Sequence, residues 1–198
     1  MDFRADGTLA VSVLDGFALL RPPRFRRVEL VADGAGAMDH NVFMRWSRTS
    51  ETMMVLSDFG CAVYRPGSED PVATFEAAGL FVAQASSPAT DETAVLYPDF
   101  MAVHAADGAI AVRAEVEASS GELHWSHDGQ LIAVAWQREG AAGFMVLDRS
   151  ELRLVHAAER HRGSGRVLVA WHPSRRRLAF AEGSVVRVRD FDNDPESP

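Results

Sequence analysis

The feature of this sequence that most restricts its fold is a pattern that recurs about every 40 residues, in which a polar turn precedes a segment of small and branched apolar residues. The five copies begin at Phe3, Trp46, Ala85, Trp125 and Trp171, so that their separations are 43, 39, 40 and 46 residues. The copy at Ala85 lacks the aromatic residue and is recognised by its spacing. A period of this length is typical of proteins in which each repeat is one supersecondary unit that packs on its neighbours.

Each copy predicts short β-strands. In the copy around Trp125, the alternating and apolar runs are Glu122–Ser126, Leu131–Trp136, Gly143–Asp148 and Leu152–Ala157. Residues 148–160 also have some helical composition, but apolar and polar residues alternate there as they do in a strand. Four strands per repeat make one blade of a β-propeller, and the regular spacing favours that fold over a β-sandwich.

Two segments of the repeats resemble a known family. Trp125-Ser-His-Asp-Gly and Trp171-His-Pro-Ser, each followed by leucine and small apolar residues, look like the repeats of WD-repeat and TolB-type propellers. The resemblance is fullest over residues 122–190. It departs from the WD pattern where Leu147-Asp148 and Arg189-Asp190 replace Trp-Asp, and no Gly-His pair begins a blade. It implies an all-β propeller of about five four-stranded blades, with the aromatic anchors packed between blades.

The last blade is expected to be incomplete. Only three strands are predicted in it, at Arg166–Trp171, Arg177–Ala181 and Val185–Asp190. We therefore expect one repeat domain over residues 1–191, followed by a flexible acidic tail over residues 192–198.

Two arrangements of the blades stay open. The chain is either a closed five-blade monomer or an open arc that forms an edge-paired dimer, since unpaired strand edges attract other strands.

The resemblance implies that the second turn of each blade and the loops between blades lie on one binding face. We expect the partner-binding residues to lie on this face. They are Asp15, Asp58, Phe59, Asp99, Arg138, Glu139 and Glu182 in the turns, and Arg160, His161 and Arg162 in the loop before the last blade. One carboxylate falls in each second turn. Asp and Gly are also the residues that hairpin turns prefer for conformational reasons. A ring of carboxylates would hold a cation or a basic peptide.

No catalytic residue, metal site or cofactor is predicted. His124 and His127 are three residues apart, so on a strand they would point to opposite faces, and no histidine spacing resembles a zinc site. A Gly-x-Ser-x-Gly elbow is absent, and Cys61 is expected to be a small core residue. The first hypothesis is a non-catalytic scaffold that presents propeller loops to a protein or peptide. The alternative is a propeller that binds a sugar or cation, or hydrolyses a substrate, with carboxylates at its mouth.

Charge and composition restrict the partners. The net charge is −8, and residues 66–150 hold 13 acidic residues and 3 arginines, whereas residues 151–189 hold 9 arginines and 3 acidic residues. This balance argues against a nucleic-acid partner. The apolar stretch Leu9–Leu20 is interrupted by Asp15 and is too short to span a bilayer, so no membrane partner is expected. With one cysteine there is no internal disulfide, and a cytoplasmic location is the default expectation.

Overall fold

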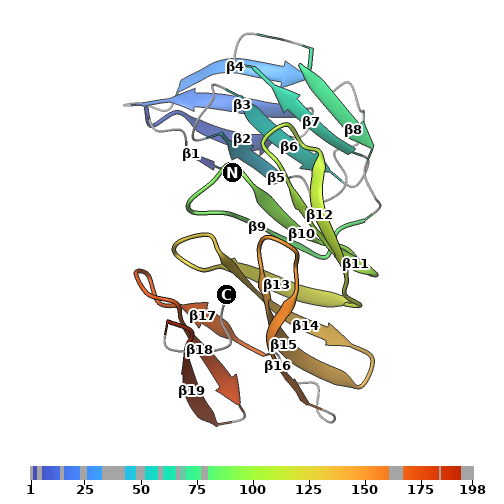
Figure 1. The fold of residues 1–198 in the computed structure, drawn as a ribbon. Coiled ribbons are helices and arrows are strands. Elements are labelled where there is room, and N and C mark those ends of the chain that lie inside the picture. The colour runs from blue at the N-terminus through green and yellow to red at the C-terminus, as the bar shows by residue number, and fades with distance from the viewer. Residues whose placement is uncertain are drawn as a thin grey trace. The chain divides into compact units, whose positions relative to one another are not determined.

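The computed structural model consists of antiparallel β-sheets (Figure 1). It describes residues 2–3, 6–13, 16–22, 26–32, 43–47, 52–57, 60–65, 68, 70–76, 80–160, 167–182 and 184–192. Every regular element within these ranges is a strand. The described residues include no helix that is long and apolar enough to cross a bilayer. The chain divides into two compact units, Met1–Leu80 with Ala105–Ala109 and Phe81–His104 with Ile110–Pro198.

The first unit contains two four-stranded sheets. Sheet 1 consists of β1 (Asp2–Phe3), β2 (Leu9–Val13), β3 (Gly16–Arg21) and β4 (Arg26–Ala32), and sheet 2 of β5 (Phe43–Trp46), β6 (Met53–Ser57), β7 (Gly60–Tyr64) and β8 (Ala73–Glu76). In each sheet the strands pair in chain order. Their shared core includes Leu19, Met44 and the anchor Trp46, which is 4% exposed.

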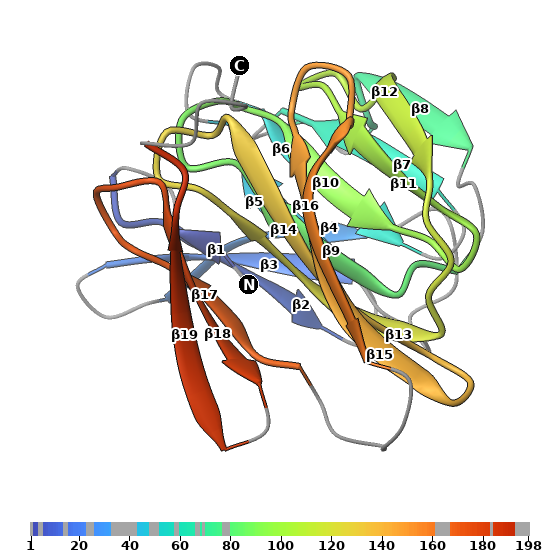
Figure 2. The same cartoon turned by 60° about the horizontal axis from the view of Figure 1, so that its bottom comes forward.

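The second unit contains the other three sheets. Sheet 3 consists of β9 (Ala83–Ser86), β10 (Thr93–Leu96), β11 (Phe100–His104) and β12 (Ile110–Glu115), and sheet 4 of β13 (Ser120–Trp125), β14 (Leu131–Arg138), β15 (Ala141–Asp148) and β16 (Leu154–Arg160). Sheet 5 has three strands, β17 (Val169–Trp171), β18 (Arg177–Glu182) and β19 (Val185–Asp190), drawn in orange and red in Figure 2. The strands of each sheet again pair in chain order.

These sheets confirm the predicted repeat, including the weak copy at Ala85, which begins sheet 3. They also confirm four strands in each of the first four repeats and three strands in the fifth repeat. Several strand ends differ from the prediction: β13 and β15 begin two residues earlier than expected, and β14, β16 and β18 extend further. β16 begins at Leu154 instead of Leu152, because Leu152 lies in the preceding turn with a φ of 54°. β17 begins at Val169, later than predicted. The single domain over residues 1–191 stays a prediction. The flexible tail also stays a prediction, and its residues 193–198 lie outside the described ranges.

Sheet 4 packs on sheet 3 with one face and on sheet 5 with the other. Because successive residues of a strand point to opposite faces, β14 contributes Ile132 and Val134 to the core with sheet 3, and Ala133 and Ala135 to the core with sheet 5. Both faces are therefore covered. This explains why β14 reads as a continuous apolar run.

The repeated tryptophans connect neighbouring sheets. The indole Nε1 of Trp125 in sheet 4 donates a hydrogen bond to the carbonyl oxygen of Ala85 in sheet 3, at 2.9 Å. The indole Nε1 of Trp171 in sheet 5 likewise donates to the carbonyl oxygen of His124 in sheet 4, at 2.9 Å. In both cases the acceptor lies on the first strand of the preceding sheet. The expectation that these aromatic anchors pack between repeats is confirmed.

Candidate partner-binding site

The structure describes five of the ten predicted site residues at least in part. Asp99 lies in the β10–β11 turn, and Arg138 and Glu139 lie where β14 turns into β15; all three are exposed. Arg160 ends β16 and Glu182 ends β18. The others, Asp15, Asp58, Phe59, His161 and Arg162, lie outside the described residues.

The loop between β12 and β13, residues 116–119, brings two of these turns to the same end of sheets 3 and 4. The backbone N–H of Ala118 donates to the carbonyl of Pro98 at 2.9 Å, and that of Ser119 donates to the carbonyl of Gln137 at 2.8 Å. Asp99 follows Pro98 and Arg138 follows Gln137. The second turns of sheets 3 and 4 and the loop between them therefore lie together. That their side chains bind a partner stays a prediction.

A groove of about 570 Å³ lies between β12 and the outer strands of sheet 4, beside Arg138. Its apolar lining includes Trp136 from β14, Met145 and Leu147 from β15, Leu152 from the turn, and Leu154 and Ala157 from β16. The groove was not predictable from the sequence, because its lining comes from four separate segments and no contiguous motif marks it.

Leu154 is the large apolar residue of this lining that is exposed. Its exposed fraction is 61%, whereas Leu147 and Leu152 on the groove floor are buried. Ala157 on the same strand is also exposed. The groove thus has a buried apolar floor and an apolar lip open to solvent, which is the arrangement of a site that covers an apolar side chain of a ligand.

The rim of the groove is charged. Glu115, Glu117 and Arg138 line it, and both glutamates are exposed. Nη1 of Arg138 lies 3.5 Å from Oε2 of Glu117, and its guanidinium lies over the Trp136 ring, 5.0 Å from the ring centroid. An exposed pair of this kind contributes at most about 1 kcal/mol. A ligand can therefore exchange it for contacts of its own.

A smaller cavity of about 300 Å³ lies against β13 and β14, where Ser120, Glu122 and Gln137 supply its polar lining. The Glu122 carboxylate lies 3.6 Å from Nε2 of His124, slightly beyond hydrogen-bonding distance. Glu122 is the single carboxylate among the described lining residues. Across the described part of the chain, no three His, Cys, Asp or Glu side chains lie close enough together to bind a metal ion.

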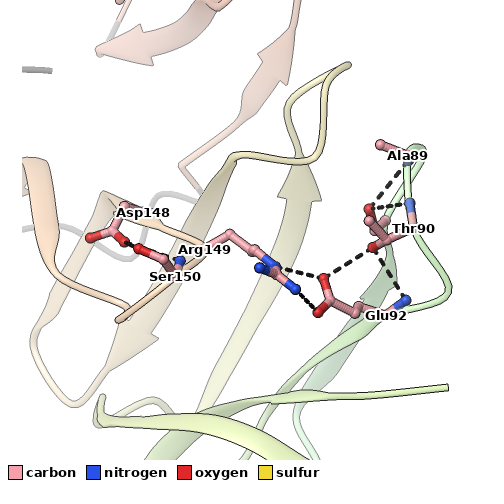
Figure 3. Close-up of polar contacts among 7 residues, drawn as sticks. Ala89, Thr90, Glu92, Asp148, Arg149 and Ser150 are labelled. Atoms are coloured by element: carbon pink, nitrogen blue, oxygen red, sulfur yellow. Dashed lines mark hydrogen bonds and ion pairs between the residues drawn. The ribbon is translucent and has the colours of Figure 1, made fainter. Parts of the chain in front are cut away.

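At the opposite end of the same sheets, an ion pair connects a turn of sheet 3 to a turn of sheet 4. Nε of Arg149 donates to Oε2 of Glu92 at 2.7 Å, Nη2 of Arg149 contacts Oε1, and the hydroxyl of Thr90 donates to Glu92 at 3.0 Å (Figure 3). The hydrogen bonds to Glu92 raise the pKa of Arg149. Glu92 is 8% exposed, so this carboxylate has a structural role between the sheets.

A second ion pair connects sheet 4 to sheet 5, because Nε of Arg176 lies 2.6 Å from Oδ2 of Asp128. Burial raises the pKa of Asp128, but hydrogen bonds from Ser126, Arg176 and the Gln130 backbone outweigh it and lower the pKa. Neither ion pair was predictable from the sequence, because the partners are 57 and 48 residues apart.

Asp148 organises the turn between β15 and β16. Its carboxylate accepts hydrogen bonds from the backbone N–H groups of Ser150, Glu151 and Arg153, at 3.1, 3.0 and 3.0 Å. Burial raises the pKa of Asp148, but the Ser150 hydroxyl and these amides outweigh burial, so the pKa lies below its ordinary value. At the position where a WD repeat ends in Trp-Asp, the aspartate of this chain therefore acts as a turn cap.

No protein-family model and no curated protein matches this sequence. Solved structures do match. The Dos1 propeller has a TM-score of 0.74 and 13% identity, over 95% of this chain and 55% of that chain. The WD40 domain of Toxoplasma gondii coronin has a TM-score of 0.67 and 13% identity, over 96% and 53%.

The chain is built of WD-repeat-like β-propeller blades. Sheets 1 to 5 are thus blades 1 to 5, and the predicted fold class is confirmed. KlAtg21, in a complex with the coiled coil of AgAtg16, also matches, with a TM-score of 0.67 and 11% identity over 99% of this chain and 67% of that chain. This chain spans between about half and two thirds of the length of the matched chains.

Proposed function

We propose that this chain is a non-catalytic protein-interaction module that binds an apolar, basic segment of a partner protein in the groove between blades 3 and 4. The observation that carries the proposal is the groove itself, whose volume is about 570 Å³ and whose open lip is formed by Leu154. A cytoplasmic location is part of the proposal and rests on the single cysteine, Cys61.

The apolar lining favours an aliphatic or aromatic side chain of the partner. A single exposed leucine is common on protein surfaces and needs no explanation. Here, however, Leu154 and Ala157 continue into a floor formed by Leu147 and Leu152, so the apolar surface is contiguous and concave. Contiguous apolar surface beside a cavity is characteristic of interaction sites.

The charged rim favours a basic flank in the partner. Glu115 and Glu117 are both exposed there, against one arginine, Arg138. A lysine or arginine of the partner would replace Arg138 beside Glu117 and gain a second carboxylate in Glu115. Charge complementarity of this kind raises the association rate and orients the partner.

The comparisons support protein binding as a function that this fold performs. KlAtg21, one of the matched propellers, is in complex with a coiled coil of another protein. Propellers also have other functions, so it is the groove of this chain that supports protein binding here.

The groove supports a hydrolytic or sugar-cleaving site less well. Acid–base catalysis at neutral pH needs one carboxyl group kept protonated by a desolvated environment. Glu115 and Glu117 are exposed, and Glu117 is paired with Arg138. The smaller cavity contains the single carboxylate of Glu122 among its described lining residues.

A random peptide library displayed on phage and selected on the wild-type protein tests the proposal. We expect enriched peptides to combine leucine, isoleucine or phenylalanine with lysine or arginine. Synthetic versions should bind Leu154→Asp and Glu117→Lys at least about tenfold more weakly, a loss of about 1.4 kcal/mol.

The matched control is Leu80→Asp, since Leu80 is 64% exposed but does not line the groove. Peptides that bind Leu80→Asp as tightly as wild type, and lose affinity for Leu154→Asp, support the proposed site. Enrichment of acidic peptides, or equal binding to all three variants, would contradict it.

A further inference from the structure

The groove between blades 3 and 4 has two chemically different ends. At one end Leu152 and Leu154 supply apolar surface, and Leu147 pairs with Leu154 across the sheet. At the other end Glu117 lies beside Arg138, with its Oε2 atom 3.5 Å from Nη1 of the arginine. A ligand that uses the whole groove therefore needs an apolar group and a cationic group at a defined distance from each other.

The strand register gives the distance between the two ends. The guanidinium of Arg138 lies over the ring of Trp136, and Trp136 pairs with Gly143. A Cβ atom added at Gly143 would lie 2.8 Å from the Trp136 ring, so the ring itself lies over Gly143. Leu147 is four residues further along β15. Because a strand rises about 3.3 Å per residue, the charged end and the apolar end are about 13 Å apart.

The groove is narrow for this length. A volume of about 570 Å³ over a length of about 13 Å gives a mean cross-section of about 44 Å². An extended chain in stacked sheets occupies about 4.8 Å by 10 Å, which is about 48 Å². An α-helix with its side chains is about 10–12 Å in diameter, which is roughly 80–110 Å². The groove therefore has room for one extended chain and not for a helix.

The charged end favours a cation. Glu115 and Glu117 are both exposed and stand on either side of Val116, which is 5% exposed. Together with Arg138 they give this end a net charge of −1 among the described lining residues. The opposite end has no charged residue among its lining residues, so the two ends select different groups of a ligand.

We propose that the groove binds an extended segment of a partner protein in which a basic residue lies four positions from an aliphatic or aromatic residue. Residues four positions apart in an extended chain project from the same face, about 13 Å from each other. The apolar side chain would lie against Leu147 and Leu154, and the cation beside Glu115 and Glu117. This inference rests on the proposed function, because it specifies the segment that the same groove binds.

Peptides with a threonine background, which favours an extended conformation, test the spacing. Each labelled peptide carries one leucine and one 2,3-diaminopropionic acid, a basic residue whose ammonium group stays close to the backbone. The two are separated by two, four, six or eight positions, in both orders. Fluorescence anisotropy measures affinity. We expect a separation of four positions to bind at least about fivefold more tightly than the other separations.

Variants of the protein locate the two groups of the peptide. Glu115→Gln combined with Glu117→Gln should weaken the four-position peptide about fivefold, but should leave unchanged a control peptide with norvaline in place of the basic residue. Leu154→Asp should weaken both peptides. The matched control is Asp70→Asn, an exposed carboxylate that does not line the groove, and it should change neither affinity.

Three results would overturn the inference. One is equal affinity at all four separations. Another is tightest binding at eight positions, which span about 12 Å in a helix and would make the segment helical. The third is an absence of binding by the designed peptides at about 1 mM, the weak limit of specific binding. The phage-selected peptides separate this failure from that of the proposed function, which stands if they bind wild type and lose affinity for Leu154→Asp.

Discussion

The indole Nε1 of Trp171 lies 2.9 Å from the carbonyl oxygen of His124 and donates a hydrogen bond across the boundary between blades 5 and 4. Trp171→Phe keeps an aromatic ring but removes the donor. We expect it to lower the free energy of unfolding by about 1–2 kcal/mol, because the acceptor loses its partner at a packed interface. Urea unfolding measures the loss. Leu168→Ala, at a 53% exposed leucine, should change stability by less than about 0.5 kcal/mol.

The ion pair of Glu92 and Arg149 should couple blades 3 and 4 energetically. Arg149→Met leaves the nearly buried carboxylate of Glu92 without its guanidinium, and we expect a loss of about 2 kcal/mol. A double-mutant cycle with Glu92→Gln should give a coupling energy of about 1–3 kcal/mol. The exposed pair of Arg138 and Glu117 is the matched control, with an expected coupling of about 0.5 kcal/mol or less. Equal coupling energies in the two cycles would contradict the prediction that the buried pair is coupled more strongly than the exposed pair.

Asp148 should make stability depend on acid pH. Although burial raises its pKa, the hydrogen bonds from Ser150, Glu151 and Arg153 lower it below the ordinary value of 3.8. A carboxyl whose pKa is lower in the folded state stabilises the protein above its unfolded pKa, and that stabilisation is lost as pH falls through the folded pKa.

Urea unfolding at several pH values between about 7 and 2 should therefore show wild type losing stability below about pH 4. Asp148→Asn should be less stable at neutral pH, by about 1–2 kcal/mol, because an amide oxygen replaces the charged acceptor. It should also lose less on acidification than wild type does. A parallel pH dependence in the two proteins would contradict this role of Asp148.

Two turn glycines should respond differently to alanine. Gly140 has a φ of 72° with no heavy atom within 4 Å of an added Cβ, so Gly140→Ala should cost the left-handed strain alone, about 1–2 kcal/mol. Gly129 has a φ of 70°, and its Cβ would lie 2.8 Å from Oγ of Ser87 in blade 3. We expect Gly129→Ala to cost about 1–3 kcal/mol more, because the adjacent turn must shift. Thermal unfolding of both variants compares them.

Most of the fold was predictable from local patterns. The alternation of Val185–Asp190 and the apolar run at Leu131 identified β19 and β14, because the period of a strand is expressed in contiguous residues. The start of β16 was wrong by two residues. An alternating pattern places Leu152 in the strand, but the side chain of Asp148 binds the amides of the turn and keeps Leu152 outside it.

The candidate site was predictable only in part. Asp99 and Arg138 were correctly placed in turns, since each turn is encoded by neighbouring residues. The groove beside Arg138 was not predictable, because its lip at Leu154 and its rim at Glu115 belong to different blades. Leu154 reads as one more apolar residue of a strand until the position of the neighbouring blade shows that it remains uncovered.

The sequence by itself determined the repeat length, the number of strands in each blade and the tryptophans that begin the best copies. Each of these depends on interactions within about 40 residues, which spacing and alternation record directly. The tertiary structure decided which carboxylates form ion pairs between blades, as Glu92 does with Arg149, and which are exposed at the surface, as Glu115 is. That division depends on how one blade stacks on the next, and residues 57 positions apart carry no mutual signal in the chain.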